Sequence, residues 1–340
     1  MQPTRPSLIS GMFKEKLWLE MIVLALAFGL LSILMSSYWV VDFMIFCIFV
    51  LAFDLLYGYM GHLTFGIMLY YGTGAYTTAL WLSLVNQNAA LAIGMAMLVT
   101  ALLAALLGAI AIKTKHASFA LINMAFNEIG YFFVRSFLKD VTHGDDGLSC
   151  TADPLFGLID FYNTTHIFLL LLIVLMAVYY GLKRLTGSPY GIAIRCIKED
   201  EERVRFLGYN TAFYKWLTFV IASVLAGLAG CLFALSQGFV SPEVMSPFGN
   251  VDVIFSALIG GAGYLYGGLA GALVFMLIKN YLPVWTSDIG TALPFEIPQW
   301  EMWLGIVLLL IVFAWPKGIV GLIRDKLINR PQPVPASQEG

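Results

Sequence analysis

The chain has 340 residues, of which 60% are hydrophobic and only 12% are charged, and its mean hydropathy is +0.84. These values exclude the ordinary globular class and place the chain among polytopic membrane proteins. The net charge is −2, and no basic patch with interleaved aromatic residues indicates a nucleic-acid partner.

Ten apolar segments are candidates for membrane spans, because a spanning helix needs about 20 apolar residues to cross ~30 Å of hydrocarbon. In chain order they are residues 17–37, 39–57, 66–85, 89–112, 117–138, 165–182, 212–236, 251–265, 268–282 and 301–316. The third, eighth and ninth are short or interrupted by glycine. The first is too long for a signal-peptide core and lacks a small-residue cleavage site, so we expect it to be retained. The sequence therefore predicts an all-α polytopic membrane protein with about ten transmembrane helices.

The basic residues predict the orientation, since Lys and Arg concentrate in cytoplasmic loops. Ten crossings that begin inside place 15 of the 19 basic residues on the inner side, with both termini cytoplasmic. The expected organisation is one transmembrane domain over residues 1–330 followed by a polar tail at 331–340. Within that domain, residues 139–164 form an outer loop and residues 183–210 form a cytoplasmic segment.

The outer loop is acidic and turn-rich. The string from Thr142 to Gly147 has metal-ligand residue types but lacks the spacing of a calcium loop. Asp-Gly and Gly-Asp pairs favour turns, so a turn is expected there. The loop as a whole is either a solvated connector or a docking surface. The four cysteines are too scattered to indicate a disulfide framework or a metal site.

Two glycine-rich stretches interrupt the apolar pattern, one before the third span and one between the eighth and ninth. The candidate helix-breaking glycines are Gly58, Gly61, Gly66, Gly260, Gly261 and Gly263. A broken membrane helix is tolerated where protein or water satisfies the freed backbone groups, and glycine also permits tight helix packing. If the chain consists of two inverted five-helix halves, breaks at corresponding places point to a site at the interface of the halves.

Glu128 is the only carboxylate far from both ends of a predicted span, and Asn123 and Asn127 lie nearby. A charge at the centre of a bilayer is costly, so Glu128 is expected to face a bundle interior or a water-filled path. It serves either a structural role or a substrate path. Asp54, like Asp42 and Asp252, lies near a helix end and is expected to reach interfacial water.

The charged cytoplasmic segment is predicted to form one helix outside the lipid. Ser188 before Pro189 is a helix-start signal, and Gly208 is placed to end the helix. Glu199 with Arg203, and Glu201 with Arg205, are i, i+4 ion pairs in the favourable order. An apolar stripe runs along one side, formed by Ala193, Cys196, Ile197, Val204 and Leu207. The stripe faces either a protein partner or the bilayer surface, and the four acidic residues 199–202 favour a protein over anionic lipid.

The chain has no phosphate-binding Gly-x-x-x-x-Gly-Lys-Ser/Thr loop and no room for a separate nucleotide-binding domain. It also lacks a Ser/His/Asp, Cys/His or paired-carboxylate constellation, so we expect no catalytic residue. Any ATP chemistry must therefore come from a partner.

Several strings occur in the order and spacing of a known family. They are GYMGHLTFG (58–66), GTGAY (72–76), AFNEI (125–129), THGDDGL (142–148), the region from Lys215 through AGLAG (226–230), IGGAG (259–263) and WPKGIVGL (315–322). Together with the charged segment, they resemble the permease subunits of ABC importers for branched-chain amino acids, the LivM type. Departures cluster at the first glycine-rich stretch: His62 replaces the usual Gln, Asp54 the usual Asn, and Ile67 to Tyr71 a His-Ala-Ala-Phe-like run.

The resemblance implies a multi-pass protein of the bacterial inner membrane, surrounded by lipid, that pairs with a homologous second permease subunit. It further implies two cytoplasmic ATPase subunits, which would hold ATP and magnesium, and an extracytoplasmic substrate-binding protein. No cofactor is expected in this chain. Residues expected to couple to the ATPase are Gly191, Ala193, Arg195, Glu199, Glu202, Arg203, Leu207 and Gly208. Residues expected to line the translocation path are Tyr70, Tyr71, Thr73, Asn123, Asn127, Glu128 and Ser256.

Two alternatives stay open at this stage. A urea or short-amide importer is the nearer one, because related permeases carry those solutes and the departures lie beside the expected path. The other is an ion-coupled secondary transporter or channel, in which Glu128 would titrate as the coupling group.

Overall fold

The computed structural model describes residues 7–114, 116–155, 157, 159–161, 163–292, 300–314 and 318–319. Within these residues the chain is almost entirely helical, with a single two-stranded antiparallel sheet of β1 (Leu148–Ser149) and β2 (Phe239–Val240). The predicted all-α class is therefore confirmed. The polar tail at 331–340 lies outside the described residues, as does the end of the predicted domain from 320 to 330.

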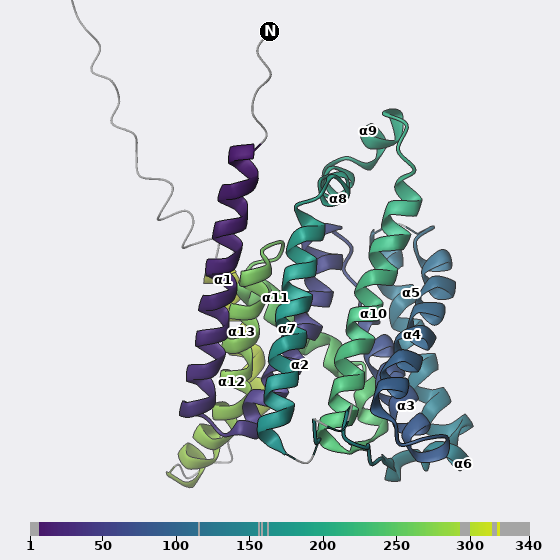
Figure 1. Cartoon of the computed structure of the whole chain (residues 1–340), viewed down its shortest axis with the longest axis vertical. Helices are drawn as coiled ribbons and strands as arrows, with labels where there is room; N and C mark the ends of the chain where they lie inside the picture. The colour runs from purple at the N-terminus through teal and green to yellow at the C-terminus, as the bar shows by residue number, and fades with distance from the viewer. Residues whose placement is uncertain are drawn as a thin grey trace, which may run out of the picture.

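The helices follow one another as an irregular bundle (Figure 1). They are α1 (Ser7–Leu34), α2 (Ser37–Asp54) with the π-helical η1 (Leu55–Tyr59), α3 (Ile67–Leu84), α4 (Ala89–Ala111), α5 (His116–Phe132) with the π-helical η2 (Phe133–Phe137), α6 (Lys139–Thr142), the 3-10 turn η3 (Gly144–Asp146), α7 (Thr164–Thr186), α8 (Pro189–Glu199), α9 (Glu201–Phe206), α10 (Thr211–Gln237), the 3-10 turn η4 (Pro242–Met245), α11 (Phe248–Gly260), α12 (Leu265–Ala292) and α13 (Trp300–Ala314).

Six helices in the described part of the chain are long and apolar enough to cross a bilayer. They are Ser37–Tyr59, Ala89–Ala111, Ala117–Phe137, Thr164–Thr186, Thr211–Gln237 and Leu265–Val284. They match the second, fourth, fifth, sixth, seventh and ninth predicted spans. Helices α1, α3 and α13 occupy the first, third and tenth, and the total of ten crossings stays a prediction.

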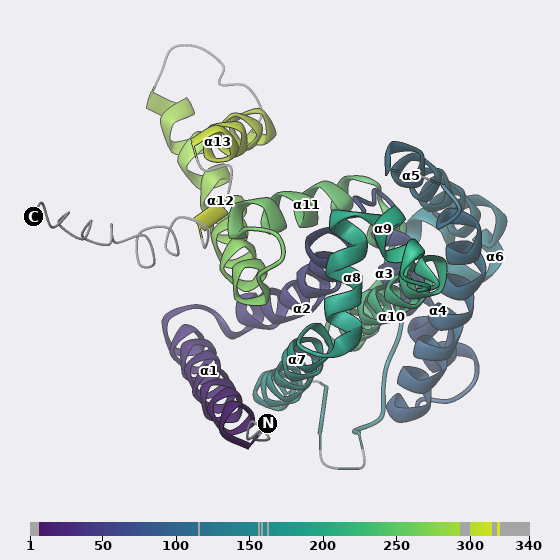
Figure 2. The same cartoon turned by 90° about the horizontal axis from the view of Figure 1, so that it is seen from above.

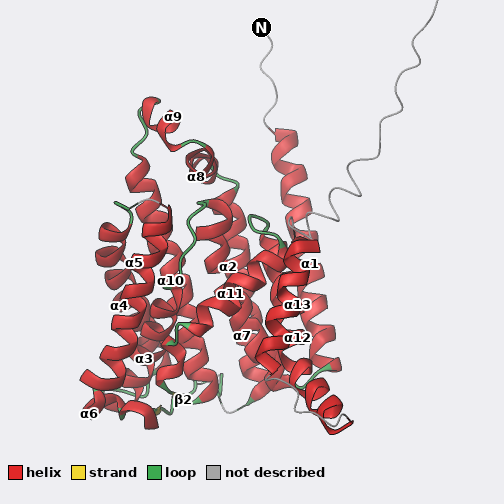
Figure 3. Cartoon of the chain, turned by 180° about the vertical axis from the view of Figure 1, so that it is seen from behind, coloured by secondary structure: helices red, strands yellow, loops and turns green. Residues whose placement is uncertain are grey.

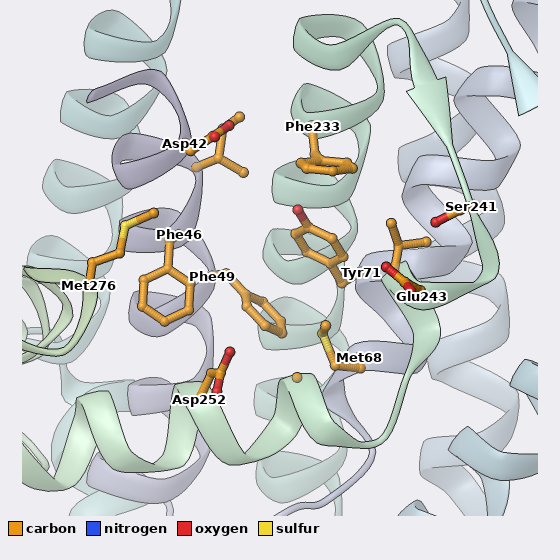
Figure 4. A pocket seen from close by; sticks show the side chains of 13 residues that line it. Asp42, Phe46, Phe49, Met68, Tyr71, Phe233, Ser241, Glu243, Asp252 and Met276 are labelled. Carbon is orange, nitrogen blue, oxygen red and sulfur yellow. The ribbon is translucent and has the colours of Figure 1, made fainter. Parts of the chain in front are cut away.

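The eighth predicted span differs from expectation. Residues 251–265 do not form one helix, because α11 has only 13 residues and ends at Gly260. At 1.5 Å per residue it is about 20 Å long, shorter than the hydrocarbon core. It lies crosswise to α2 and α10 instead of running beside them (Figures 2 and 4). The glycines that end it let the chain turn into α12.

The core forms where α2 and α10 meet α3. Helix α2 is apolar around its whole circumference, and every residue from Phe43 to Asp54 except Phe46 is buried. Helices α3 and α10 approach closely because glycines face backbone across their contact: a Cβ on Gly74 would lie 2.0 Å from the Gly227 carbonyl oxygen. Small residues at membrane helix contacts allow this approach. The outer helices instead expose leucines, as a lipid-facing surface requires.

The two ends of the bundle carry different features. The start of α1 and the short helices α8 and α9 lie at one end, whereas α6 and the outer loop lie at the other (Figures 1 and 3). A salt bridge from Lys183 on α7 to Glu20 ties α1 to the bundle. This arrangement agrees with the predicted grouping of segments, and which end faces the cytoplasm stays a prediction.

Candidate functional site

The first glycine-rich stretch breaks the chain as predicted. Helix α2 widens into the π-helix that contains Gly58, and an irregular segment follows to Gly66. Gly61 adopts a φ of +78°, which a side-chain-bearing residue rarely adopts. Gly66 lies against the Asn123 backbone of α5, where a Cβ would be 2.2 Å from the carbonyl oxygen. Close backbone contact therefore requires glycine there.

The second glycine-rich stretch is also a break. Helix α11 stops at Gly260, and Gly261 and Gly263 have φ values of +100° and +88°. Gly260 packs on α12, since a Cβ there would lie 1.9 Å from the Gly267 carbonyl oxygen. The glycines of this stretch therefore serve both purposes: they break the helix, and they allow tight packing of α11 on α12.

The two breaks meet in space. The Gly263 amide donates a 2.8 Å hydrogen bond to Oδ1 of Asp54. A Cβ on Gly58 would lie 2.3 Å from the Gly263 nitrogen, so the two backbones are in direct contact. Asp54 is fully buried, with Oδ2 lacking a partner in the described structure. The expectation that Asp54 reaches interfacial water is wrong, because the broken backbone of another segment covers it.

The charged segment at residues 183–210 does not form one helix. Ser188 caps α8 through the Gly191 amide, with Pro189 in the first turn, as predicted. Asp200 then leaves helical geometry (φ −155°, ψ 94°) and caps the separate helix α9 by accepting the Arg203 amide. The segment ends at Gly208 with φ +89°. The single-helix prediction fails because Asp200 caps a new helix instead of continuing the old one.

The break at Asp200 rearranges the predicted ion pairs. Arg203 pairs with Asp200 at 3.3 Å, so the Glu199 pair predicted for it is wrong. Glu201 pairs with Arg205 at 3.1 Å, as predicted.

Glu201 also joins the segment to α10. It accepts a hydrogen bond from Nζ of Lys215 at 2.9 Å and one from the Thr211 hydroxyl at 3.1 Å. Burial acts to raise the pKa of Glu201, but the Lys215 ammonium, the Thr211 hydroxyl and Arg205 outweigh it, and the pKa lies below its usual value.

The inward side of α8 differs from the predicted stripe. Gly191, Ile194 and Ile197 are buried against the bundle, whereas Cys196 is exposed and Ala193 half-buried. A Cβ on Gly191 would meet the Thr186 backbone at 2.4 Å. Arg195, expected to couple to a partner, is exposed and donates to the Thr186 carbonyl oxygen at 2.9 Å, so it also caps the end of α7.

Lys198 connects α8 to the meeting point of the breaks. Its Nζ donates a 2.7 Å hydrogen bond to the Gly58 carbonyl oxygen, and its aliphatic stem packs against Gly61. Gly58 lies in the last turn of this helix, where carbonyl oxygens lack an intrahelical partner and are open to a side-chain donor. Contacts therefore run without a gap from α8 through Gly58 to Gly263, at the end of α11.

The outward side of α9 exposes apolar residues at the end of the bundle. Phe206 is 90% and Leu207 72% exposed, and α9 stands beyond the ends of the long helices (Figure 1). Glu202 and Arg203 are exposed beside them, as is Glu199 on α8. We call Glu202, Arg203, Phe206 and Leu207 the α9 tip.

A cavity of about 350 Å³ lies between α2, α10 and the crosswise α11. Its lining combines carboxylates with aromatic and apolar side chains (Figure 4): Asp42, Ile45, Phe46, Phe49, Met68, Tyr71, Phe233, Ser241, Glu243, Val244, Gly249, Asp252 and Met276. Asp252 pairs with Lys279 at 2.5 Å, and Asp42 accepts the Gln237 amide at 2.8 Å. Carboxylates and ring faces suit an ammonium group, and the apolar lining suits a hydrocarbon side chain.

Of the predicted path residues, Tyr71 lines this cavity, with its ring tilted by 47° against that of Phe49 and 4.9 Å between the ring centroids. Tyr70 points elsewhere and packs edge-on to Phe219 of α10. Thr73 and Ser256 turn their hydroxyls back to carbonyls of their own helices, those of Leu69 and Asp252. The structure therefore brings Tyr71, but not these other residues, into the cavity.

The three polar residues of α5 do not share a face. Asn127 is buried and donates to the Met245 carbonyl oxygen at 2.9 Å, and Asn123 is buried with a bond to Phe119. Glu128 is exposed on the outward side of the chain. Glu128 therefore does not face the interior of this chain's own bundle, because α5 turns its amides inward and its carboxylate outward. Its expected place along a translocation path stays a prediction.

The family described as the branched-chain amino acid transport system permease component matches residues 19–314. The match covers all the elements that form the glycine breaks, the α8–α9 segment and the cavity. The chain belongs to this permease family.

The permease is similar to curated members along nearly its whole length. It is 27% identical to the high-affinity branched-chain amino acid transport system permease protein LivM of Salmonella typhimurium, over 95% of this chain and 79% of that protein. It is 28% identical to LivM of Escherichia coli over the same shares. It also matches LivH of Salmonella typhimurium at 28% identity, over 39% of this chain and 40% of LivH. No solved structure matches the permease.

Several groups in this permease carried no signal in the sequence. Phe46 and Phe49 lie in a helix that is apolar on all sides, so no periodicity separates cavity-facing from core-facing positions. Glu243 and Ser241 lie in the connection between α10 and α11, which reads as an ordinary loop. Lys198 is one of many charges in its segment, and only the fold shows that it points toward Gly58.

Proposed function

We propose that this permease is a membrane-spanning subunit of an ATP-driven importer for branched-chain or related amino acids in a bacterial inner membrane. It would pair with a homologous second permease subunit, receive substrate from an extracytoplasmic binding protein and bind two cytoplasmic ATPase subunits that hold ATP and magnesium. The family match over residues 19–314 and the names of the LivM relatives support this assignment.

The observation that carries the mechanism is the contact path from α8 to α11. Lys198 on α8 donates a hydrogen bond to the Gly58 carbonyl oxygen, and the Gly58 backbone contacts that of Gly263. The Gly263 amide in turn donates a hydrogen bond to Asp54. A displacement of α8 therefore acts on the connection that follows α11, and α11 lines the cavity at its other end through Gly249 and Asp252. In alternating access, movement of the ATPase subunits would shift α8 and thereby open or close the path beside α11.

The α9 tip is the proposed contact with the ATPase. It offers two exposed apolar side chains, Phe206 and Leu207, beside the exposed charges Glu202 and Arg203. Apolar anchors surrounded by charge are typical of protein interfaces. A lipid surface would meet the acidic side chains of this segment unfavourably.

The cavity is the proposed outer part of the path. An amino acid would place its ammonium near Glu243 and Asp42 and its side chain against Phe46 and Phe49.

Glu243→Gln should raise the KM for leucine uptake several-fold while leaving the ATPase activity of the complex unchanged. An unchanged KM would exclude Glu243 from the path.

The ion-coupled alternative is disfavoured by the position of Glu128. A titrating coupling group must lie along an internal path, and Glu128 is on the outward face of α5. The urea or short-amide alternative concerns the solute and leaves the mechanism unchanged.

Reconstitution tests the assignment. The permease would be placed in proteoliposomes with the proposed second permease, ATPases and binding protein, with leucine and, separately, urea as substrates. We expect leucine uptake that needs ATP and the binding protein. Proton-driven uptake by this chain alone would overturn the assignment. If the complete importer takes up urea but not leucine, the chain would instead be assigned to a urea or short-amide importer.

A further inference from the structure

The outward face of α5 carries a carboxylate where a lipid-facing helix should have none. Glu128 lies near the middle of the 21-residue span Ala117–Phe137 and is exposed. Its neighbours on this face are strongly apolar, with Leu121 65%, Ile129 63% and Phe132 64% exposed. Hydrocarbon chains offer no hydrogen-bond donor to a carboxylate, so lipid is a poor cover for this position.

Glu128 has no partner among the described residues of its own chain. The cation nearest to it along the helix, Arg135, is engaged by Asp145 at 2.6 Å in the outer loop. The amides of Asn123 and Asn127 are turned inward and bonded to Phe119 and Met245. The carboxylate is therefore left for something outside the chain.

The residues around Glu128 form a seam suited to another helix. Ser118, Leu121, Ala125, Glu128 and Phe132 are all exposed and follow one another at alternating intervals of three and four residues. This is the spacing of a helix that packs lengthwise against a second helix. Ser118 and Ala125 are small, which permits close approach of the backbones. We call these five residues the Glu128 seam.

We propose that the Glu128 seam is where a transmembrane helix of the second permease subunit docks, with a hydrogen-bond donor or a cationic side chain opposite Glu128. This inference rests on the proposed pairing of two permease subunits. A second copy of this chain fits less well, because a symmetric contact along the seam would bring two Glu128 carboxylates together. A partner of different sequence can supply the missing donor.

Disulfide cross-linking tests the position of the seam. The permease and its proposed second permease subunit would be co-expressed, with Cys196→Ser in this chain to remove its exposed thiol. Ala125→Cys is paired with single cysteines along each helix of the second subunit. Leu98→Cys is the matched control, because Leu98 is 51% exposed on α4, an outer helix that carries no charge. We expect a heterodimer band with Ala125→Cys at one helix of the partner and none with Leu98→Cys.

The substitution Glu128→Leu separates a protein partner from lipid. If the seam docks on the second subunit, Glu128→Leu should lower co-purification of that subunit at least tenfold, while the thermal stability of the isolated chain in detergent stays equal or rises. Glu128→Gln, which keeps a hydrogen-bonding group, should retain more of the partner than Glu128→Leu does.

Three results would overturn the inference. Undiminished co-purification of the second subunit with Glu128→Leu would assign the seam to lipid. Cross-links between two copies of this chain through Ala125→Cys would assign it to a homodimer. If the unaltered subunits co-purify but Ala125→Cys forms no cross-link while Leu98→Cys on α4 does, the seam is rejected and the proposed function stands. If the unaltered subunits do not associate at all, both the seam and the proposed function are rejected.

Discussion

The ammonium of Lys198 lies 2.7 Å from the carbonyl oxygen of Gly58, 140 residues away in the chain. Lys198 belongs to the short helix α8 at one end of the bundle, and Gly58 to the π-helical end of α2. Through Gly263 the same contact reaches the end of α11. The segment proposed to meet the ATPase is thus bonded to the place where both glycine-rich breaks meet.

Replacing Lys198 should uncouple ATP hydrolysis from transport. Lys198→Met keeps the aliphatic stem against Gly61 but removes the charged hydrogen bond, which is worth about 1.5–3 kcal/mol. We expect leucine uptake by the reconstituted importer to fall about tenfold while the ATPase subunits still bind. Lys113→Met, an exposed lysine after α4, is the control and should leave uptake unchanged. Equal uptake by the two variants would contradict the role of Lys198.

Gly58 should tolerate no side chain. In Gly58→Ala the Cβ would lie 2.2 Å from Asp54 Oδ1 and 2.3 Å from the Gly263 nitrogen, and the backbone at the second contact cannot rotate away. We expect loss of the folded protein, or a melting temperature lower by more than 5 °C, by fluorescence size-exclusion after heating. Gly94→Ala, on an outer helix with nothing within 4 Å, should be neutral or slightly stabilising. Similar losses for both variants would contradict the packing argument.

At position 54 the negative charge should be dispensable, whereas an oxygen that accepts the hydrogen bond of the Gly263 amide should be required. Asp54→Asn can keep an oxygen toward the Gly263 amide and removes a buried charge, so we expect a stability change within about 1 kcal/mol. Asp54→Leu leaves the buried amide unpaired and should cost about 1–3 kcal/mol. Unfolding in denaturant, in a fixed detergent, measures both. A more stable Asp54→Leu than Asp54→Asn would show that the hydrogen bond to Gly263 is unimportant.

Acid should weaken the attachment of α9 to α10 through Glu201. The folded pKa of Glu201 lies below its usual value, so its contribution to stability is fully present above the unfolded pKa of about 4.3. The contribution is lost as the pH falls through the lower folded pKa. We expect the melting temperature to drop more steeply below about pH 4.3 in the unaltered protein than in Glu201→Gln. Parallel curves for the two proteins would contradict this prediction.

The α9 tip should be needed for assembly but not for folding. Phe206 and Leu207 contribute little to the core, since both are largely exposed. Phe206→Ser with Leu207→Ser should therefore leave the melting temperature within about 2 °C and reduce ATPase co-purification at least tenfold. Phe239→Ser, an apolar residue exposed to 43% at the other end, is the control and should not affect ATPase binding. Normal ATPase recovery with the double variant would exclude this tip as the docking surface.

The sequence was sufficient for the features that depend on neighbouring residues. Long apolar runs identify membrane helices because the bilayer imposes one length and one composition on them. Ser188 and Gly208 were identified as helix boundaries, and Glu201 was paired correctly with Arg205, because capping and i, i+4 contacts involve residues within one or two turns. Likewise, the glycine clusters marked both breaks.

Only the tertiary structure decided the features that depend on which distant segments meet. The burial of Asp54, the contact of Lys198 with Gly58 and the crosswise position of α11 arise because one glycine-rich break packs on the other. The outward position of Glu128 depends on how α5 is rotated against η4, since Asn127 takes the inward side. Sequence alone determined that this chain is a bundle of membrane helices with two breaks; the packing of those breaks, which local spacing does not encode, decided how the charged segment reaches them.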